Sequence, residues 1–248
     1  MNWQGLALIA VAIVLCCATP DHSRAQSASP HVYSNAGNIY IDRAGGKNGT
    51  ENGTKIGSKT KLTASEMDVD PVLAPNGSYV VYTRQGRGRT IHGYDASQEC
   101  STEPRPDELR QINVDGSGDK LLLKGRKGDP KHQLCDFRQK QFSADGRRLY
   151  FLSPGWATSE ALYVLDMHSG EEHFLMPAND LLVLSFCRNN YKDDLVVLAH
   201  RYFALGGSYD WYWLYDEAGK KELGPLGPFD TPNDMAREAH GVWCAPNP

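Results

Sequence analysis

Leu162-Tyr163-Val164-Leu165-Asp166-Met167-His168-Ser169-Gly170 joins an apolar run that contains an aromatic residue to a polar turn ending in glycine. A second apolar run follows the glycine, so the stretch predicts a β-hairpin. The same arrangement occurs four times, and its turn glycines are Gly46, Gly116, Gly170 and Gly219. Successive glycines are 70, 54 and 49 residues apart. A loose recurrence of this kind indicates a β architecture built from repeated units.

Segments of a second type lie between these outer hairpins. Asp68 to Tyr82 and Phe142 to Phe151 contain Asn-Gly and Asp-Gly, respectively, beside runs rich in Val, Tyr and Phe. Because Asn-Gly and Asp-Gly favour the positive φ of a tight turn, each segment is expected to form an inner hairpin. A third inner hairpin, from Leu181 to His200, retains only a turn and its second strand.

These inner segments resemble the TolB-type β-propeller repeat, whose inner hairpin reads Asp-x-x-Pro-x-Trp-Ser-Pro-Asp-Gly-x-x-Ile-x-Phe. The matches in the first segment are Asp68, Pro71, Leu73, Pro75, Asn76, Gly77, Val80 and Tyr82. Those in the second are Phe142, Ser143, Asp145, Gly146, Leu149 and Phe151, whereas Lys140 and Ala144 stand where prolines are usual. The resemblance covers most of residues 32 to 223 and implies a propeller that binds a protein partner.

The sequence therefore predicts an all-β fold, a β-propeller of about four blades built from antiparallel four-stranded sheets. The first outer hairpin lacks an inner partner ahead of it, because few residues precede His31 once a leader is removed. The C-terminal segment, with Asp230, Pro232 and Gly241-Val242-Trp243-Cys244, is expected to supply that partner and to close the ring. An open stack of sheets, or a dimer that completes the ring, is the competing geometry.

The N-terminus carries an unbroken apolar run from Leu6 to Ala18, which is too short to span a bilayer. Small residues near Ala25 form an Ala-x-Ala-like cleavage pattern. We therefore expect a signal peptide over residues 1–25, a propeller domain over residues 26–248 and a periplasmic or secreted location. No later apolar run is long enough to predict a membrane span.

Cysteine usage is consistent with export. Cys16 and Cys17 fall in the leader, where lipid modification is the alternative to simple removal. The four other cysteines allow three connectivities, of which we favour Cys100 with Cys135 and Cys187 with Cys244. No Cys-x-x-Cys pair occurs, so the cysteines predict neither a metal site nor a redox site.

The sequence contains no strong catalytic signature: no Gly-x-Ser-x-Gly, no His-Glu-x-x-His, no P-loop and no Gly-x-Gly-x-x-Gly. We therefore predict no catalytic residues, no cofactor and no metal. A formal net charge of −4 and a pI near 6.1 give no drive toward nucleic acid. The alternative is a small propeller hydrolase or lyase that acts on glycans through a metal held by His168, His173, His200 or His240.

Two sets of residues are candidates for binding. Arg84, Arg87 and Arg89 form a basic loop at the start of an insertion rich in turn formers. Trp211 and Trp213 belong to an aromatic stretch that suits a sugar or protein platform, although packing between neighbouring blades explains the same residues. The predicted function is an exported, non-catalytic binding module that contacts a protein partner, or a glycan, in the cell envelope.

Overall fold

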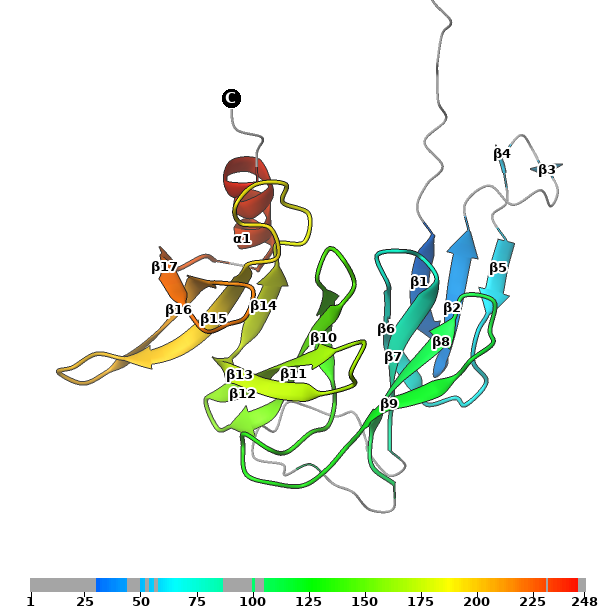
Figure 1. Cartoon of the computed structure of the whole chain (residues 1–248), viewed down its shortest axis with the longest axis horizontal. Coiled ribbons are helices and arrows are strands. Elements are labelled where there is room, and N and C mark those ends of the chain that lie inside the picture. Colours follow the sequence, from blue (N-terminus) through cyan, green and yellow to red (C-terminus); the bar gives the residue numbers. More distant parts are fainter. Residues whose placement is uncertain are drawn as a thin grey trace, which may run out of the picture.

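The computed structural model describes residues 30–43, 50–51, 54–55, 58–86, 100, 105–230 and 232–244. The predicted signal peptide over residues 1–25 lies outside them. In the described part of the chain, four antiparallel sheets follow one another along the sequence (Figure 1). The first sheet contains β1 (His31–Asn35), β2 (Asn38–Arg43) and β5 (Ser58–Lys61), and the second contains β6 (Asp68–Leu73), β7 (Tyr79–Arg84), β8 (Glu108–Asn113) and β9 (Lys120–Lys124).

The third and fourth sheets repeat the four-stranded order. The third contains β10 (Arg138–Phe142), β11 (Arg148–Trp156), β12 (Ser159–Asp166) and β13 (Glu172–Ala178). The fourth contains β14 (Asp180–Val183), β15 (Leu195–Tyr202), β16 (Ser208–Tyr215) and β17 (Glu222–Gly227). A small hairpin of β3 (Thr50–Glu51) and β4 (Thr54–Lys55) lies between β2 and β5 in the sequence.

The sheets are arranged along an arc, with the first and fourth at opposite ends (Figure 1). The innermost strands β6, β10 and β14 contact one another in series, so they line the inner side of the arc. The all-β prediction is confirmed for the described residues, apart from the C-terminal helices described below. Three of the four sheets have the predicted four antiparallel strands, in the order in which the chain supplies them.

An apolar cluster fills each junction between neighbouring sheets, because the middle strands β7, β11 and β15 carry apolar side chains that alternate between the two faces of their sheets. The first junction is filled by Ile39, Ile41, Leu62, Val80, Tyr82 and Ile112. The second contains Val81, Leu109, Phe137, Leu149, Phe151 and Tyr163 among others. The third contains Tyr150, Leu152, Leu162, Leu181, Leu195 and Val197. Sheet-to-sheet packing of this kind is what holds a propeller together.

The tight turns expected from Asn-Gly and Asp-Gly are present. Gly77 has φ +69° and Gly146 has φ +71°, values that the absence of a Cβ makes inexpensive. Gly116, Gly170 and Gly219 also lie in the turns of outer hairpins with positive φ. Gly46 lies outside the described residues. The repeated hairpins read from the sequence are therefore confirmed in the second, third and fourth sheets.

The prediction that the C-terminal segment closes the ring as a strand is wrong. Residues Pro232–Glu238 form the helix α1, and the short helical segment η1 (Ala239–Trp243) follows it. Met235 and Ala239, four residues apart on one helical face, pack on the fourth sheet against Tyr212. Among the described residues, the first sheet keeps three strands. None of the helices in these ranges has the length and apolar character needed to cross a membrane.

The local sequence explains why a helix forms here. Pro232 is suited to the first turn of a helix, where its missing N–H costs nothing. The following residues, through Gly241, include no β-branched side chain. The C-terminal segment therefore forms a helix that covers the outer face of the fourth sheet. It does not add a strand to the first sheet.

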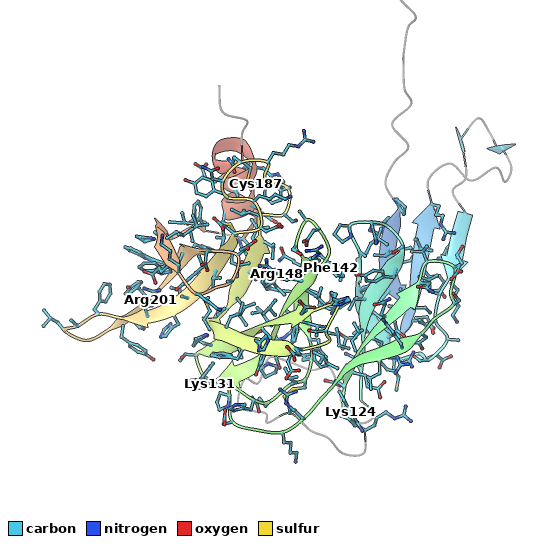
Figure 2. The ribbon with its side chains drawn as sticks, in the orientation of Figure 1. Lys124, Lys131, Phe142, Arg148, Cys187 and Arg201 are labelled. Carbon is cyan, nitrogen blue, oxygen red and sulfur yellow. A yellow bond between two sulfur atoms is a disulfide. The ribbon has the colours of Figure 1, made fainter. Side chains whose placement is uncertain are left out.

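Both disulfides have the pairing that was favoured from the sequence. Cys100 and Cys135 have Cα atoms 5.6 Å apart, and Cys187 and Cys244 have Cα atoms 4.7 Å apart. Cys187 lies in the loop after β14, beside α1 (Figure 2). The second disulfide therefore fastens the C-terminal segment to the sheet on which it packs.

Candidate functional site

Charged side chains gather where the inner strands of the second and third sheets meet. Asp70 lies on β6, Arg138 and Lys140 lie on β10, Asp136 lies two residues before β10, and Glu160 lies near the start of β12. We call these five residues the axial cluster. Asp70 and Lys140 form an ion pair between the two sheets, and Arg138 forms ion pairs with Asp136 and Glu160.

Lys140 forms the centre of the axial cluster. Its side chain is 1% exposed, and its Nζ donates to Asp70 Oδ2 at 2.5 Å, to Thr83 Oγ1 at 2.9 Å and to the Phe137 carbonyl at 2.6 Å. Burial lowers the pKa of the Lys140 ammonium, while the neighbouring Asp70 carboxylate opposes that shift. All three ammonium donors are therefore used inside the protein, across the junction of two sheets.

Arg138 is held in a similar way on the same strand. Its Nε lies 3.1 Å from Asp136 Oδ2, and its Nη2 lies 2.9 Å from Glu160 Oε1. A guanidinium fixed between two carboxylates loses little freedom on meeting a further acceptor. The cluster therefore holds three acidic and two basic groups, of which Asp70, at 54% exposure, is the most accessible.

The backbone beneath the cluster is strained. Asp70, Asp136, Phe137 and Gln139 have φ values of +50°, +64°, +24° and +49°, although none is glycine. The register of β6 with β7 shifts between Val69 and Val72, and that of β10 with β11 shifts between Arg138 and Gln141. Bulges re-aim side chains, and strain of this kind concentrates at functional sites. The inner strands therefore depart from regular β geometry where the charges gather.

Glutamines of β10 complete the inner surface on the side of the fourth sheet. Gln141 donates from Nε2 to the Leu181 carbonyl at 2.6 Å and accepts from the Val183 N–H at 2.9 Å. Gln139 Oε1 accepts from the Leu181 N–H at 3.1 Å. These side chains satisfy backbone groups on the inner edge of β14, which protects that edge from pairing with another strand.

The sequence contains one signal for this site: Lys140 stands at a position of the repeat where proline is usual. That departure alone does not predict a cluster of charges. Strict strand alternation would place the side chains of Asp68 and Asp70 on the same face of the strand. In the structure the two carboxylates bind different cations, because the bulge at Val69 interrupts the alternation: Asp68 binds Arg84, and Asp70 binds Lys140.

The predicted binding residue Arg84 is occupied within its own sheet. Its Nε and Nη2 donate to the two carboxylate oxygens of Asp68 at 2.7 and 3.0 Å, and Asp68 is completely buried. The Tyr82 hydroxyl accepts a further bond at 3.1 Å. Arg87 and Arg89 lie outside the described residues. The structure therefore places Arg84 in a structural ion pair.

The two predicted tryptophans lie on one face of β16 and differ in exposure. Trp213 is 9% exposed, and the Arg201 guanidinium covers its ring at 3.5 Å from the ring centre. Trp211 is half-buried and meets Tyr209 edge-on at 5.1 Å. Packing, the alternative to a binding platform, therefore describes Trp213, and only Trp211 belongs to an accessible aromatic surface.

The histidines of the metal alternative are distributed over two sheets and the C-terminal segment. His168 and His173 flank the β12–β13 turn, His200 pairs with Asp210 at 2.8 Å, and His240 stacks on Phe186 at 3.6 Å. In the residues that the structure describes, no three His, Cys, Asp or Glu side chains gather as metal ligands would. These four histidines therefore do not share a site.

A separate acidic group, at the base of the fourth sheet, makes stability depend on pH. Burial, together with the carboxylates of Asp216 and Glu217, raises the pKa of Asp194 from 3.8 to about 6. The folded chain therefore holds this proton more tightly than the unfolded chain does. Its contribution is fully present below pH 4 and is lost as the pH rises through 6.

We predict that Asp194→Asn raises the free energy of unfolding by about 1 kcal/mol at pH 7.5 and leaves it unchanged below pH 4. Urea denaturation of both proteins at the two pH values measures the difference. Asp230→Asn, at an exposed carboxylate, serves as the control and is expected to change neither value. A gain of equal size at both pH values would contradict the assignment.

Comparison with known proteins finds similarities of fold alone. No protein-family model and no curated protein matches the chain. An oligogalacturonate lyase in complex with manganese is 15% identical, with a TM-score of 0.48 over 79% of this chain and 43% of that one. TolB from Acinetobacter baumannii is 12% identical, with a TM-score of 0.37 and coverages of 82% and 53%.

The β-propeller domain of the Trilobed protease from Pyrococcus furiosus is 13% identical, with a TM-score of 0.42 and coverages of 80% and 58%. The structural neighbours thus include TolB and other β-propeller proteins, at low sequence identity. The chain spans 43 to 58% of the length of these three proteins.

Proposed function

We propose that the chain is an exported, non-catalytic β-propeller that binds a protein partner in the cell envelope through the axial cluster. The observation that carries this proposal is a set of fixed charges on strained inner strands, with Asp70 still open to a donor. In this proposal residues 1–25 are a leader, residues 26–248 are the propeller, and the mature protein is periplasmic or secreted.

The chemistry of the cluster supports recognition over catalysis. The three donors of the Lys140 ammonium are engaged by Asp70, Thr83 and Phe137, so the amine is not available as a nucleophile or a base. Arg138 is likewise bound to two carboxylates. Groups held this firmly change little on binding, which reduces the entropy lost when a partner docks.

Asp70 defines the chemistry that a partner must offer. Its side chain is 54% exposed, and its Oδ2 accepts from Lys140. No described residue donates to its Oδ1. A lysine, an arginine or an exposed N–H group of the partner would donate a charge-assisted hydrogen bond to Oδ1 of this carboxylate.

The two disulfides support export. Disulfides persist in oxidising compartments such as the periplasm and the extracellular space, and they are rare in the cytosol. Cys100–Cys135 anchors the end of the predicted insertion to the segment before β10, and Cys187–Cys244 anchors the C-terminal segment.

Chemical cross-linking in an envelope extract tests the proposal with the mature protein, residues 26–248, as bait. Asp70→Asn keeps an oxygen for Lys140 but removes the negative charge, and we expect it to reduce partner recovery at least tenfold. Glu171→Gln, at a side chain 74% exposed in the β12–β13 turn, is the control and should recover the partner fully. Absence of any specific partner, or equal recovery by both variants, would refute the proposal.

A further inference from the structure

Part of the fourth sheet extends beyond its flanking strands. β14 pairs only with Leu195–Leu198 of β15, and β17 pairs only with Tyr212–Tyr215 of β16. Residues Ala199 to Trp211 therefore form a two-stranded ribbon, which we call the hairpin arm. Among the described strands, none pairs with either edge of the arm. Figure 1 shows the arm protruding from the end of the arc, away from the other sheets.

The tip of the hairpin arm is apolar and exposed. Tyr202, Phe203 and Leu205 are 69%, 54% and 102% exposed, and they account for three of the six exposed large hydrophobic side chains of the described residues. The run from Tyr202 to Tyr209 contains no charged residue. Leu205 thus makes almost no contact with its own chain, although apolar surface in water carries a free-energy cost. Exposed apolar surface concentrated in this way indicates a binding surface.

Polar character increases along the arm from the tip toward the sheet. Directly behind the tip, Tyr209 packs on Phe203 with ring centres 4.6 Å apart. The next positions carry two ion pairs: His200 with Asp210 at 2.8 Å, and Arg201 with Glu222 at 2.5 Å. Figure 2 labels Arg201 in the fourth sheet at the base of the arm.

This order matches the profile of a bilayer surface. Apolar side chains enter the acyl boundary, Tyr and Trp rings favour the headgroup level, and ionic groups stay in water. Strands rise about 3.3 Å per residue, so the tip and the tyrosines span the roughly 5–10 Å depth of an interfacial insertion. We propose that the hairpin arm inserts its tip into the interfacial region of a lipid bilayer.

The shape of the arm favours lipid over a protein groove. A protein partner requires a complementary pocket around each anchoring side chain, whereas lipid chains rearrange around any apolar protrusion. Gly206 and Gly207, with φ values of +99° and +84°, give the tip a convex turn without side chains that would hold it in one shape. The arm is distinct from the axial cluster, so this inference stands apart from the proposed function.

The charges of the arm also specify the type of membrane binding. Arg201 and His200 already have carboxylate partners, and no described residue of the tip is basic. The attraction to anionic lipid that a basic patch provides is therefore missing. Binding is expected to occur on zwitterionic vesicles and to be insensitive to salt and to the anionic lipid fraction.

Flotation of the mature protein with phosphatidylcholine vesicles tests the inference. We expect the wild-type protein to float with the vesicles in both 50 and ~500 mM salt, since Debye screening does not weaken apolar insertion. Phe203→Ser combined with Leu205→Ser should weaken binding at least tenfold, because both apolar side chains are lost from the inserted tip. Both positions are exposed, so the variant keeps its fold, which circular dichroism verifies.

The matched control is Leu121→Ser combined with Tyr191→Ser, at side chains 46% and 41% exposed outside the arm. This variant is expected to float like the wild-type protein. Absence of flotation by the wild-type protein, or equal flotation by the tip variant, would overturn the inference. Loss of a cross-linked protein partner by the tip variant, with no vesicle binding by the wild-type protein, would assign the arm to a protein.

Discussion

Replacing Arg84 with alanine is expected to lower the free energy of unfolding by about 3–5 kcal/mol, because it leaves the Asp68 carboxylate buried without its cation. Asp68 is 0% exposed, and both of its oxygens accept from Arg84 in a fork geometry. Chemical denaturation measures the loss directly. In a chain of this size the midpoint of thermal unfolding should fall by about 10 °C.

A matched control separates burial from charge in this experiment. Arg147 also faces an aspartate, Asp145, but at 3.7 Å and with 81% of its side chain exposed. Because exposed pairs contribute only about 0–1 kcal/mol, Arg147→Ala should change stability little. If Arg84→Ala unfolded no more easily than Arg147→Ala, Arg84 would be available for binding and not committed to the fold.

Replacing Cys187 and Cys244 with serine is expected to cost about 4 kcal/mol, given the loop-closure entropy of a bridge between cysteines 57 residues apart. The bond fastens α1 and η1 to the fourth sheet, where Met235 and Ala239 are buried. Without it the C-terminal segment should open locally before the sheets unfold. Limited proteolysis followed by mass spectrometry should detect early cleavage between residues 228 and 244.

The other disulfide provides the comparison. Cys100→Ser with Cys135→Ser removes a bridge of similar span, 35 residues, at the junction of the second and third sheets. That variant should lose stability while its C-terminal segment stays resistant to protease. Equal protease sensitivity of the two variants would show that the helices do not depend on Cys187–Cys244 for their attachment.

The repeated hairpins could be predicted because their determinants are local. A turn such as Asn76-Gly77 and the alternation of the strand after it lie within a few residues of each other. The favoured disulfide pairing rested on the expectation that one bridge holds the insertion and the other anchors the C-terminal end. The prediction of a closing strand was wrong because its determinants are not local. Whether residues 230 to 244 join a sheet edge depends on contacts far away in the chain, and in the structure Met235 and Ala239 pack on the fourth sheet instead.

The axial cluster could not be predicted from local sequence patterns. Lys140 is buried because Asp70, 70 residues earlier in the chain, is brought beside it by the packing of two sheets. A bulge at Val69 then breaks the alternation that would have placed Asp70. Likewise, the aromatic stretch around Trp213 could not reveal that Arg201 covers the ring.

The helical cover on the fourth sheet also limits how copies of the chain can assemble. Head-to-tail stacking of one arc on the next would place the first sheet of one copy on the fourth sheet of another. The helix that carries Met235 and Ala239 already covers this face of the fourth sheet, and the Cys187–Cys244 disulfide attaches it covalently. At the opposite end the rings of His31, Tyr33 and Tyr40 stack along the first sheet. Direct stacking of the first sheet of one copy on the fourth sheet of another would therefore require the helix and its disulfide to be displaced.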